Sequence, residues 1–149
     1  MFHIVSQVLV RRIKIAIYIL LVTIWAPKVV VAGDATINWK LDKVTNGVEF
    51  YHALQDCGGK NVVFLMLKNK NKFQVKITWQ EVFSTQEGPG IKGYSGKKSI
   101  ELASGELKET SCTNPRNKKL IILPEQVQPT YIASISNFSY SDITVSEKL

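Results

Sequence analysis

The stretch from residue 62 to residue 79 reads VVFLMLKNKNKFQVKITW and decides the fold class. Its first six residues are apolar at every position, which is typical of a strand that is covered on both faces. Residues 68–72 are polar and predict a turn. After this turn, apolar residues recur at every second position, the period of a strand with one buried face: Phe73, Val75, Ile77 and Trp79. We therefore predict two strands joined by a short polar turn.

The same period of two extends toward the N-terminus. Asn46-Gly47 is a strong hairpin signal, because both positions accept a positive φ. Apolar positions alternate on either side of this turn, at Ile37, Trp39 and Leu41 before it and at Val48, Phe50 and Leu54 after it.

The C-terminal half also predicts short strands. They are expected near residues 100–102, 107–112, 120–123, 131–135 and 138–145. Residues 84–97 predict a long loop instead, since they contain four glycines and a proline.

Eight or nine short strands, with no helical periodicity after Ala32, predict an all-β protein. We expect a single antiparallel β-sandwich domain over residues 33–149. Cys57 and Cys112 with Trp79 between them are compatible with an immunoglobulin-like architecture. Thr110 stands where a tyrosine corner would place its tyrosine, so a true immunoglobulin domain is not predicted. Six apolar residues that keep the strand period are expected in the core: Trp39, Phe50, Val63, Leu65, Ile77 and Trp79.

Residues 1–32 are predicted to be a signal peptide. A basic region precedes twelve uncharged residues, 15–26, and Val30 and Ala32 occupy the −3 and −1 positions before a cleavage site. Cleavage after Ala32 would release a secreted or periplasmic protein with no membrane contact. The alternative is a retained N-terminal membrane anchor, with the domain on the extracytoplasmic side.

The charge of the chain is concentrated in that segment. The formal net charge is +7, but residues 1–32 hold four of the basic residues and no acidic one. The remaining chain is close to balanced, so we expect no nucleic-acid partner.

Export changes the expectation for the two cysteines. An oxidising compartment favours a disulfide between Cys57 and Cys112, and the alternative is two buried free thiols.

The sequence indicates no catalytic, cofactor-binding or metal-binding residue, and no cofactor is expected. His52 is the only histidine after residue 32, and it falls on the apolar face of its strand, which favours a structural role. One histidine and two cysteines cannot form a structural zinc site. The segment from Gly90 to Ser99 resembles a phosphate-binding loop, but it has five residues between Gly90 and Gly96 and a lysine at position 98 where Ser or Thr is required.

A partner-binding loop is the remaining candidate site. Lys92, Tyr94, Lys97 and Lys98 lie among the glycines of residues 84–97, where an aromatic ring and several cations could contact an unidentified protein or glycan. Other basic residues also lie in predicted turns, at Lys68, Lys70 and Lys72 and at Arg116, Lys118 and Lys119. If two of these turns met at one end of the sandwich, they would form an anion-binding patch, and otherwise they are ordinary solvated turns.

Three functional hypotheses follow. The favoured one is an exported, non-enzymatic β-sandwich that binds a protein, glycan or envelope component through its loops. The alternatives are a small secreted hydrolase with a carboxylate-based site, or an assembly subunit that shares edge strands with a partner. Asn137-Phe138-Ser139 is a glycosylation sequon, which has meaning only in a eukaryotic secretory pathway.

Overall fold

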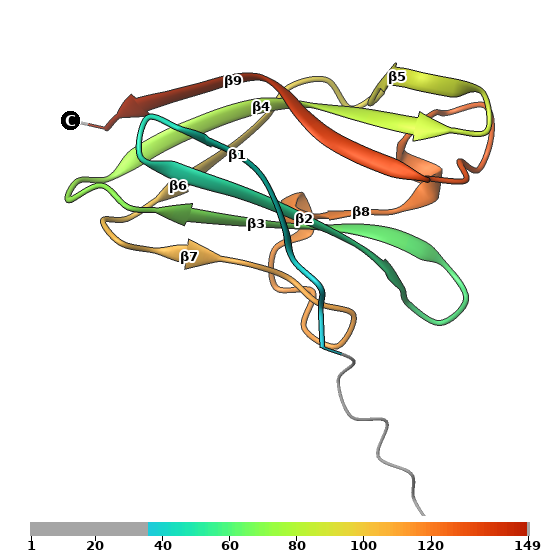
Figure 1. The fold of residues 1–149 in the computed structure, drawn as a ribbon, viewed down its shortest axis with the longest axis horizontal. Coiled ribbons are helices and arrows are strands. Elements are labelled where there is room, and N and C mark those ends of the chain that lie inside the picture. Colours follow the sequence, from blue (N-terminus) through green and yellow to red (C-terminus); the bar gives the residue numbers. More distant parts are fainter. Residues whose placement is uncertain (1–35, 149) are drawn as a thin grey trace, which may run out of the picture. The chain divides into compact units, whose positions relative to one another are not determined.

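The computed structural model describes residues 36–148, and the predicted signal peptide lies outside the described residues. Two antiparallel sheets lie face to face as a β-sandwich (Figure 1), which confirms the predicted fold class. The part of the chain that is described contains two short 3-10 turns, η1 and η2, and no α-helix. The strands are β1 Lys40–Thr45, β2 Val48–Asp56, β3 Asn61–Asn69, β4 Val75–Thr85, β5 Gly88–Lys92, β6 Lys98–Leu102, β7 Leu107–Lys108, β8 Ile121–Ile122 and β9 Asn137–Glu147.

The first sheet is built around β3. β2 pairs along the whole of β3, and β1 pairs with the other edge of β2. Two short strands share the remaining edge of β3, with β7 opposite Leu67 and Lys68 and β8 opposite Val63 and Phe64. The turn between β1 and β2 is the predicted one, with φ values of 45° at Asn46 and 75° at Gly47, as a primed hairpin turn requires.

The second sheet has the same plan around β4. β9 pairs along one edge of β4, whereas β6 and β5 share the other edge. β6 pairs with residues 75–79 and β5 with residues 82–85, so Gln80 and Glu81 lie at the junction between the two short strands. The candidate site forms at this junction.

β5 corrects one prediction. The glycine-rich residues 84–97 were expected to form a long loop, but Gly88–Lys92 pair with β4 after a short turn. Gly88 and Gly90 have φ values of 128° and 79°. These two glycines therefore allow an irregular strand with a shifted register, and they do not form an open loop. Only residues 93–97 remain as the connection to β6.

Between the sheets lies the core, and five of its six predicted members are confirmed. Phe50, Val63, Leu65, Ile77 and Trp79 are completely buried. The expectation for β3 also holds, since the residues on its opposite face are buried too: Val62, Phe64 and Met66. Aromatic rings of β2, β4 and β9 meet edge to face in the core, at Phe50, Trp79, Phe83, Phe138 and Tyr140.

Trp39 is the wrong core prediction, because it is only half-buried and precedes β1. The hairpin register would place Leu41 on the inner face opposite His52. However, Asp42 is an extra residue in β1, so Leu41 pairs with Tyr51 and is 48% exposed. A bulge of this kind reverses the alternation for the residues before it.

The bulge also fastens one side of the sandwich. The Lys43 ammonium donates a hydrogen bond to the carbonyl of Tyr140 at 2.6 Å, and the amide of Tyr140 donates to the Asp42 carboxylate at 3.4 Å. The buried Tyr140 hydroxyl donates to the carbonyl of Tyr51 at 2.7 Å. β1 and β2 of one sheet are thereby joined to β9 of the other.

A buried asparagine organises the opposite end. Asn69 is completely buried at the end of β3, and its amide donates to the carbonyls of Phe73 and Ala103, both at 2.8 Å. Its side-chain oxygen accepts the backbone N–H of Asn71 at 2.9 Å. The polar turn predicted at residues 68–72 is therefore held by Asn69 rather than by its lysines.

Two further strand predictions are wrong in extent. The strand expected over 107–112 is reduced to the two residues of β7, and residues 131–135 form no strand. Ala133 and Ile135 are nevertheless buried, so the apolar residues of that segment cover the core without joining a sheet.

The disulfide between Cys57 and Cys112 is present, with 5.7 Å between the Cα atoms. It joins the end of β2 to the loop after β7, whereas an immunoglobulin disulfide connects two sheets through the core. The predicted distinction from a true immunoglobulin domain agrees with this position. Within residues 36–148, no helix is long and apolar enough to cross a membrane.

Candidate functional site

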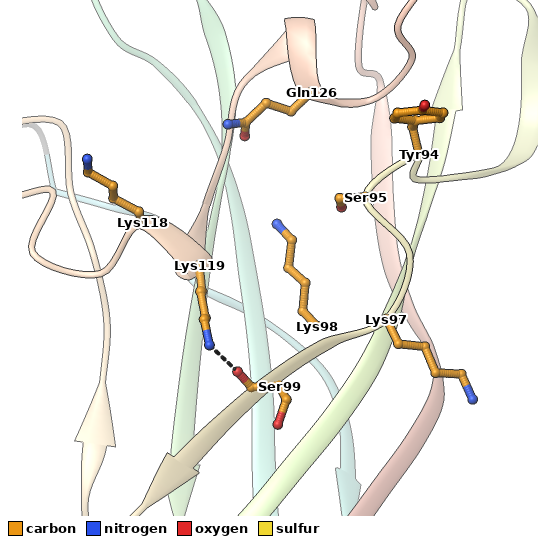
Figure 2. A pocket seen from close by; sticks show the side chains of 8 residues that line it. All are labelled: Tyr94, Ser95, Lys97, Lys98, Ser99, Lys118, Lys119 and Gln126. Atoms are coloured by element: carbon orange, nitrogen blue, oxygen red, sulfur yellow. Dashed lines mark hydrogen bonds between the residues drawn. The ribbon is translucent and has the colours of Figure 1, made fainter.

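A groove of about 670 Å³ opens beside the junction of β5 and β6. Its walls come from the 93–97 connection, the start of β6, η1 (Lys118–Leu120) and η2 (Pro124–Gln126). Its size is within the range of small-molecule sites, about 300–1,000 Å³. Eight residues line it (Figure 2): Tyr94, Ser95, Lys97, Lys98, Ser99, Lys118, Lys119 and Gln126.

Lys98 is held in the groove by a buried acid. As the first residue of β6 it pairs with Trp79, on the inner face of the sheet. Its ammonium lies 2.7 Å from a carboxylate oxygen of Glu81, which is 1% exposed. Burial raises the pKa of Glu81 above its ordinary value, while Lys98 and the Ser95 hydroxyl act in the opposite direction. Glu81 therefore fixes the position of Lys98 and offsets part of its charge.

The 93–97 connection is shaped around Glu81. The amide of Gly93 donates to the backbone carbonyl of Glu81 at 3.0 Å, and the Gln80 side chain donates to the carbonyl of Gly93 at 3.1 Å. A Cβ at position 93 would lie 3.1 Å from the Phe83 ring and 3.2 Å from the Glu81 carboxylate. A glycine is favoured here because a side chain would force these neighbours to shift by a few tenths of an ångström.

Lys119 is fixed on the opposite wall. The buried Leu120 anchors η1, so that the two preceding lysines face outward. The Lys119 ammonium donates to the carbonyl of Ser99 at 2.9 Å, across the groove (Figure 2). Lys118 lines the same wall.

Tyr94 stands at the rim of the groove. Its side chain is 72% exposed, while its amide donates to the carbonyl of Val127 at 3.1 Å. The backbone that carries the ring is therefore fixed, and the ring itself is free to contact a partner. Gln126 lies nearby in η2, and its side-chain oxygen accepts the amide of Leu123 at 3.1 Å.

The structure brings together three of the four residues predicted for a binding loop. Tyr94, Lys97 and Lys98 line the groove, although the side chain of Lys97 points away from its centre in Figure 2. Lys92 does not belong to the groove, because it lies in β5 and its ammonium is 3.8 Å from the Asp142 carboxylate.

Two of the basic segments named in the sequence analysis meet at this groove. The turn that contains Lys97 and Lys98 meets the one that contains Lys118 and Lys119, although the two are far apart in the sequence. Glu81 was not singled out from the sequence. Its position in the apolar period of β4, between Trp79 and Phe83, was the available signal.

Comparisons with known proteins give one similar fold and no sequence relative. No protein-family model matches the sequence, and no curated protein matches it. A solved structure is similar to this chain in fold. It is the crystal structure of a DUF1425 family member from Shewanella sp. pv-4, with 13% sequence identity and a TM-score of 0.43 over 78% of this chain and 94% of that one. The groove is therefore interpreted from the residues of this chain alone.

His52 lies away from the groove, on the inner face of β2. It is 2% exposed, and its ring contacts that of Phe138 edge to face at 5.4 Å. Burial lowers the pKa of His52, and the Asp42 carboxylate, 3.9 Å from Nδ1, opposes this shift. Among residues 36–148, no group of three His, Cys, Asp or Glu side chains is placed to hold a metal ion.

Proposed function

We propose that this chain is an exported, non-enzymatic binding protein that holds a negatively charged partner in the groove beside β6. The observation that carries the proposal is the convergence of lysines from two separate segments around one concave surface. Four lysines line the groove and one buried carboxylate opposes them, so the surface keeps an excess of positive charge. A concave surface lined by one sign of charge attracts ligands of the opposite sign.

An extracytoplasmic location is part of the proposal. The Cys57–Cys112 disulfide supports it, because such bonds persist in secreted and periplasmic proteins and are rare in the cytosol. The predicted signal peptide at residues 1–32 gives the route.

Binding fits the chemistry of the groove better than catalysis. The Lys98 ammonium is already paired with Glu81, so this carboxylate is occupied as a counter-ion. The Lys119 ammonium is hydrogen-bonded to a backbone carbonyl. The two ammonium groups are therefore fixed in position and can hold an anion between them.

The test removes charge from the exposed wall without disturbing the buried ion pair. A Lys118→Gln, Lys119→Gln variant is compared with a Lys40→Gln, Lys72→Gln variant, which loses the same charge at exposed positions outside the groove. Binding of the purified protein to polygalacturonate, heparin and poly-L-glutamate is measured by titration calorimetry at low and physiological salt.

We expect the groove variant to bind its preferred polyanion about tenfold more weakly, because two exposed charges together contribute on the order of 1–2 kcal/mol. Added salt should weaken binding by the native protein and have a smaller effect on the groove variant. Equal losses in the two variants, or no binding to any of the three polyanions, would contradict the proposal.

A further inference from the structure

We infer that the partner is an acidic carbohydrate, with its carboxylate or sulfate group against Lys98 and Lys119 and a sugar ring against Tyr94. This inference rests on the proposed function and specifies the ligand of the same groove. It follows from how the ammonium groups are held, from the polar and aromatic groups beside them, and from the state of the neighbouring strand edge.

The two ammonium groups are held in place by the protein. Glu81 fixes Lys98 at 2.7 Å, and the carbonyl of Ser99 fixes Lys119 at 2.9 Å. An ammonium has three N–H donors, so each lysine retains donors for a ligand after this bond is made. Figure 2 shows Lys98 rising along the middle of the groove, with Lys119 on one side and Ser95 on the other. An oxyanion with several acceptor atoms matches such an arrangement.

The remaining groups suit a sugar. Ser95, Ser99 and Gln126 line the groove with hydroxyl and amide groups, which can exchange hydrogen bonds with sugar hydroxyls. Tyr94 presents a rigid, amphipathic surface at the rim, and its main chain is fixed by the bond to Val127. A sugar ring offers a flat face of C–H groups to such a side chain. One ligand can therefore contact the lysines and the Tyr94 ring at the same time.

An acidic peptide is the competing partner, and the edge of β6 disfavours it. Extended peptides commonly bind by adding a strand to an exposed sheet edge, through a row of free backbone groups. On β6 the outward carbonyl of Ser99 already accepts a bond from Lys119, and that of Glu101 accepts one from Lys108 at 2.7 Å. A peptide strand would have to displace both lysines, whereas an acidic sugar uses Lys119 where it lies.

The experiment compares acidic sugars with a neutral sugar and an acidic peptide, on variants that leave the buried core intact. The probes are a galacturonate hexasaccharide, its neutral methyl ester, a heparin hexasaccharide and hexaglutamate. The proteins are the full chain, Tyr94→Ala, Tyr94→Phe and the two lysine variants described above. The Tyr94 side chain is mostly exposed and its structural bond is made by the backbone, so both substitutions should leave folding unchanged.

We expect one of the acidic hexasaccharides to bind at least about fivefold more tightly than hexaglutamate, since only the sugar uses the aromatic ring. Tyr94→Ala should weaken sugar binding at least about fivefold and leave hexaglutamate within about twofold, while Tyr94→Phe retains binding. Binding of the galacturonate hexasaccharide would show that carboxylates suffice, whereas binding of the heparin hexasaccharide alone would show that sulfates or a higher charge are needed. Either result supports the inference when Tyr94→Ala weakens the binding.

Three outcomes would overturn the inference. In the first, hexaglutamate binds as tightly as both acidic sugars or more tightly, and its binding still depends on Lys118 and Lys119; the proposed function then stands with a peptide partner. Equal binding of the neutral methyl ester would remove the role of the anion. If no probe shows binding that depends on Lys118 and Lys119, the proposed function is overturned as well.

Discussion

Removal of the Cys57–Cys112 disulfide should destabilise the domain strongly. The bond joins residues 55 positions apart. In the chain-entropy model, a crosslink over such a length stabilises the folded state by about 4 kcal/mol, because it restricts the unfolded chain. For a domain of this size, that corresponds to a fall of about 15 °C in the melting temperature. Cys112 is exposed in the loop after β7, so a reductant reaches the bond in the folded protein.

The assay is urea unfolding of the oxidised and reduced protein, followed by tryptophan fluorescence, with Cys57→Ser, Cys112→Ser as the matched variant. The variant should match the reduced native protein and should not respond to reductant. The loop that contains Cys112 leads directly into η1, so we also expect weaker anion binding when the bond is broken. A loss of less than about 1 kcal/mol on reduction would refute the reasoning, because the crosslink would then restrict no large part of the unfolded chain.

Three other changes test the interior. Trp79→Ala should lower the free energy of unfolding by about 3–5 kcal/mol because the ring is completely buried, and Trp39→Ala by less than half as much. Equal losses in urea unfolding would contradict the assignment of the core. Asn69→Ala should cost about 2–4 kcal/mol, since it leaves several backbone groups without their bonds, whereas Asn71→Ala should cost less than about 1 kcal/mol. His52 has a lowered pKa in the folded state, so the unfolded chain binds the extra proton more readily and stability should fall as the pH drops below about 6.5. A His52→Asn variant should lose that part of the pH dependence. If its stability varied with pH as that of the native protein does, His52 would not be the group responsible.

Short-range patterns in the sequence predict much of the sandwich. The Asn46-Gly47 turn fixes a hairpin, and the alternation after it places Phe50 in the core. The period from Val75 to Trp79 likewise gives the inner face of β4. These features depend on neighbouring residues, which is why the sequence is sufficient to find them.

The errors occur where a contact with a distant segment overrides the local pattern. The Asp42 bulge reverses the expected face of Leu41, and the side chains of the bulge bond to Tyr140, far away in the sequence. Gly88–Lys92 reads as a loop because of its glycines, yet the free edge of β4 supplies it with a pairing partner.

The groove shows the same division between local and distant information. Its aromatic and two of its lysines were predicted together, because Tyr94, Lys97 and Lys98 are close in the sequence. Lys118 and Lys119 reach the groove because the chain returns to β3 through η1 and β8. The spacing of residues in the sequence does not indicate this return. Lys92 is also near in the sequence but does not line the groove, because it lies in β5 with its ammonium 3.8 Å from the Asp142 carboxylate of β9.

The bonds that join β1 and β2 to β9 have a consequence for how the sandwich opens. On that side, separation of the sheets must expose the buried Tyr140 hydroxyl and break its bond to Tyr51. On the groove side, the edge of β6 is held by the partly exposed side chains of Lys108 and Lys119. Local opening should therefore begin at β6, where backbone amides exchange with deuterated solvent earlier than those of β9 near Tyr140. A ligand that spans the groove would hold this weaker side closed, and it would stabilise the folded domain by an amount that grows with the ligand concentration.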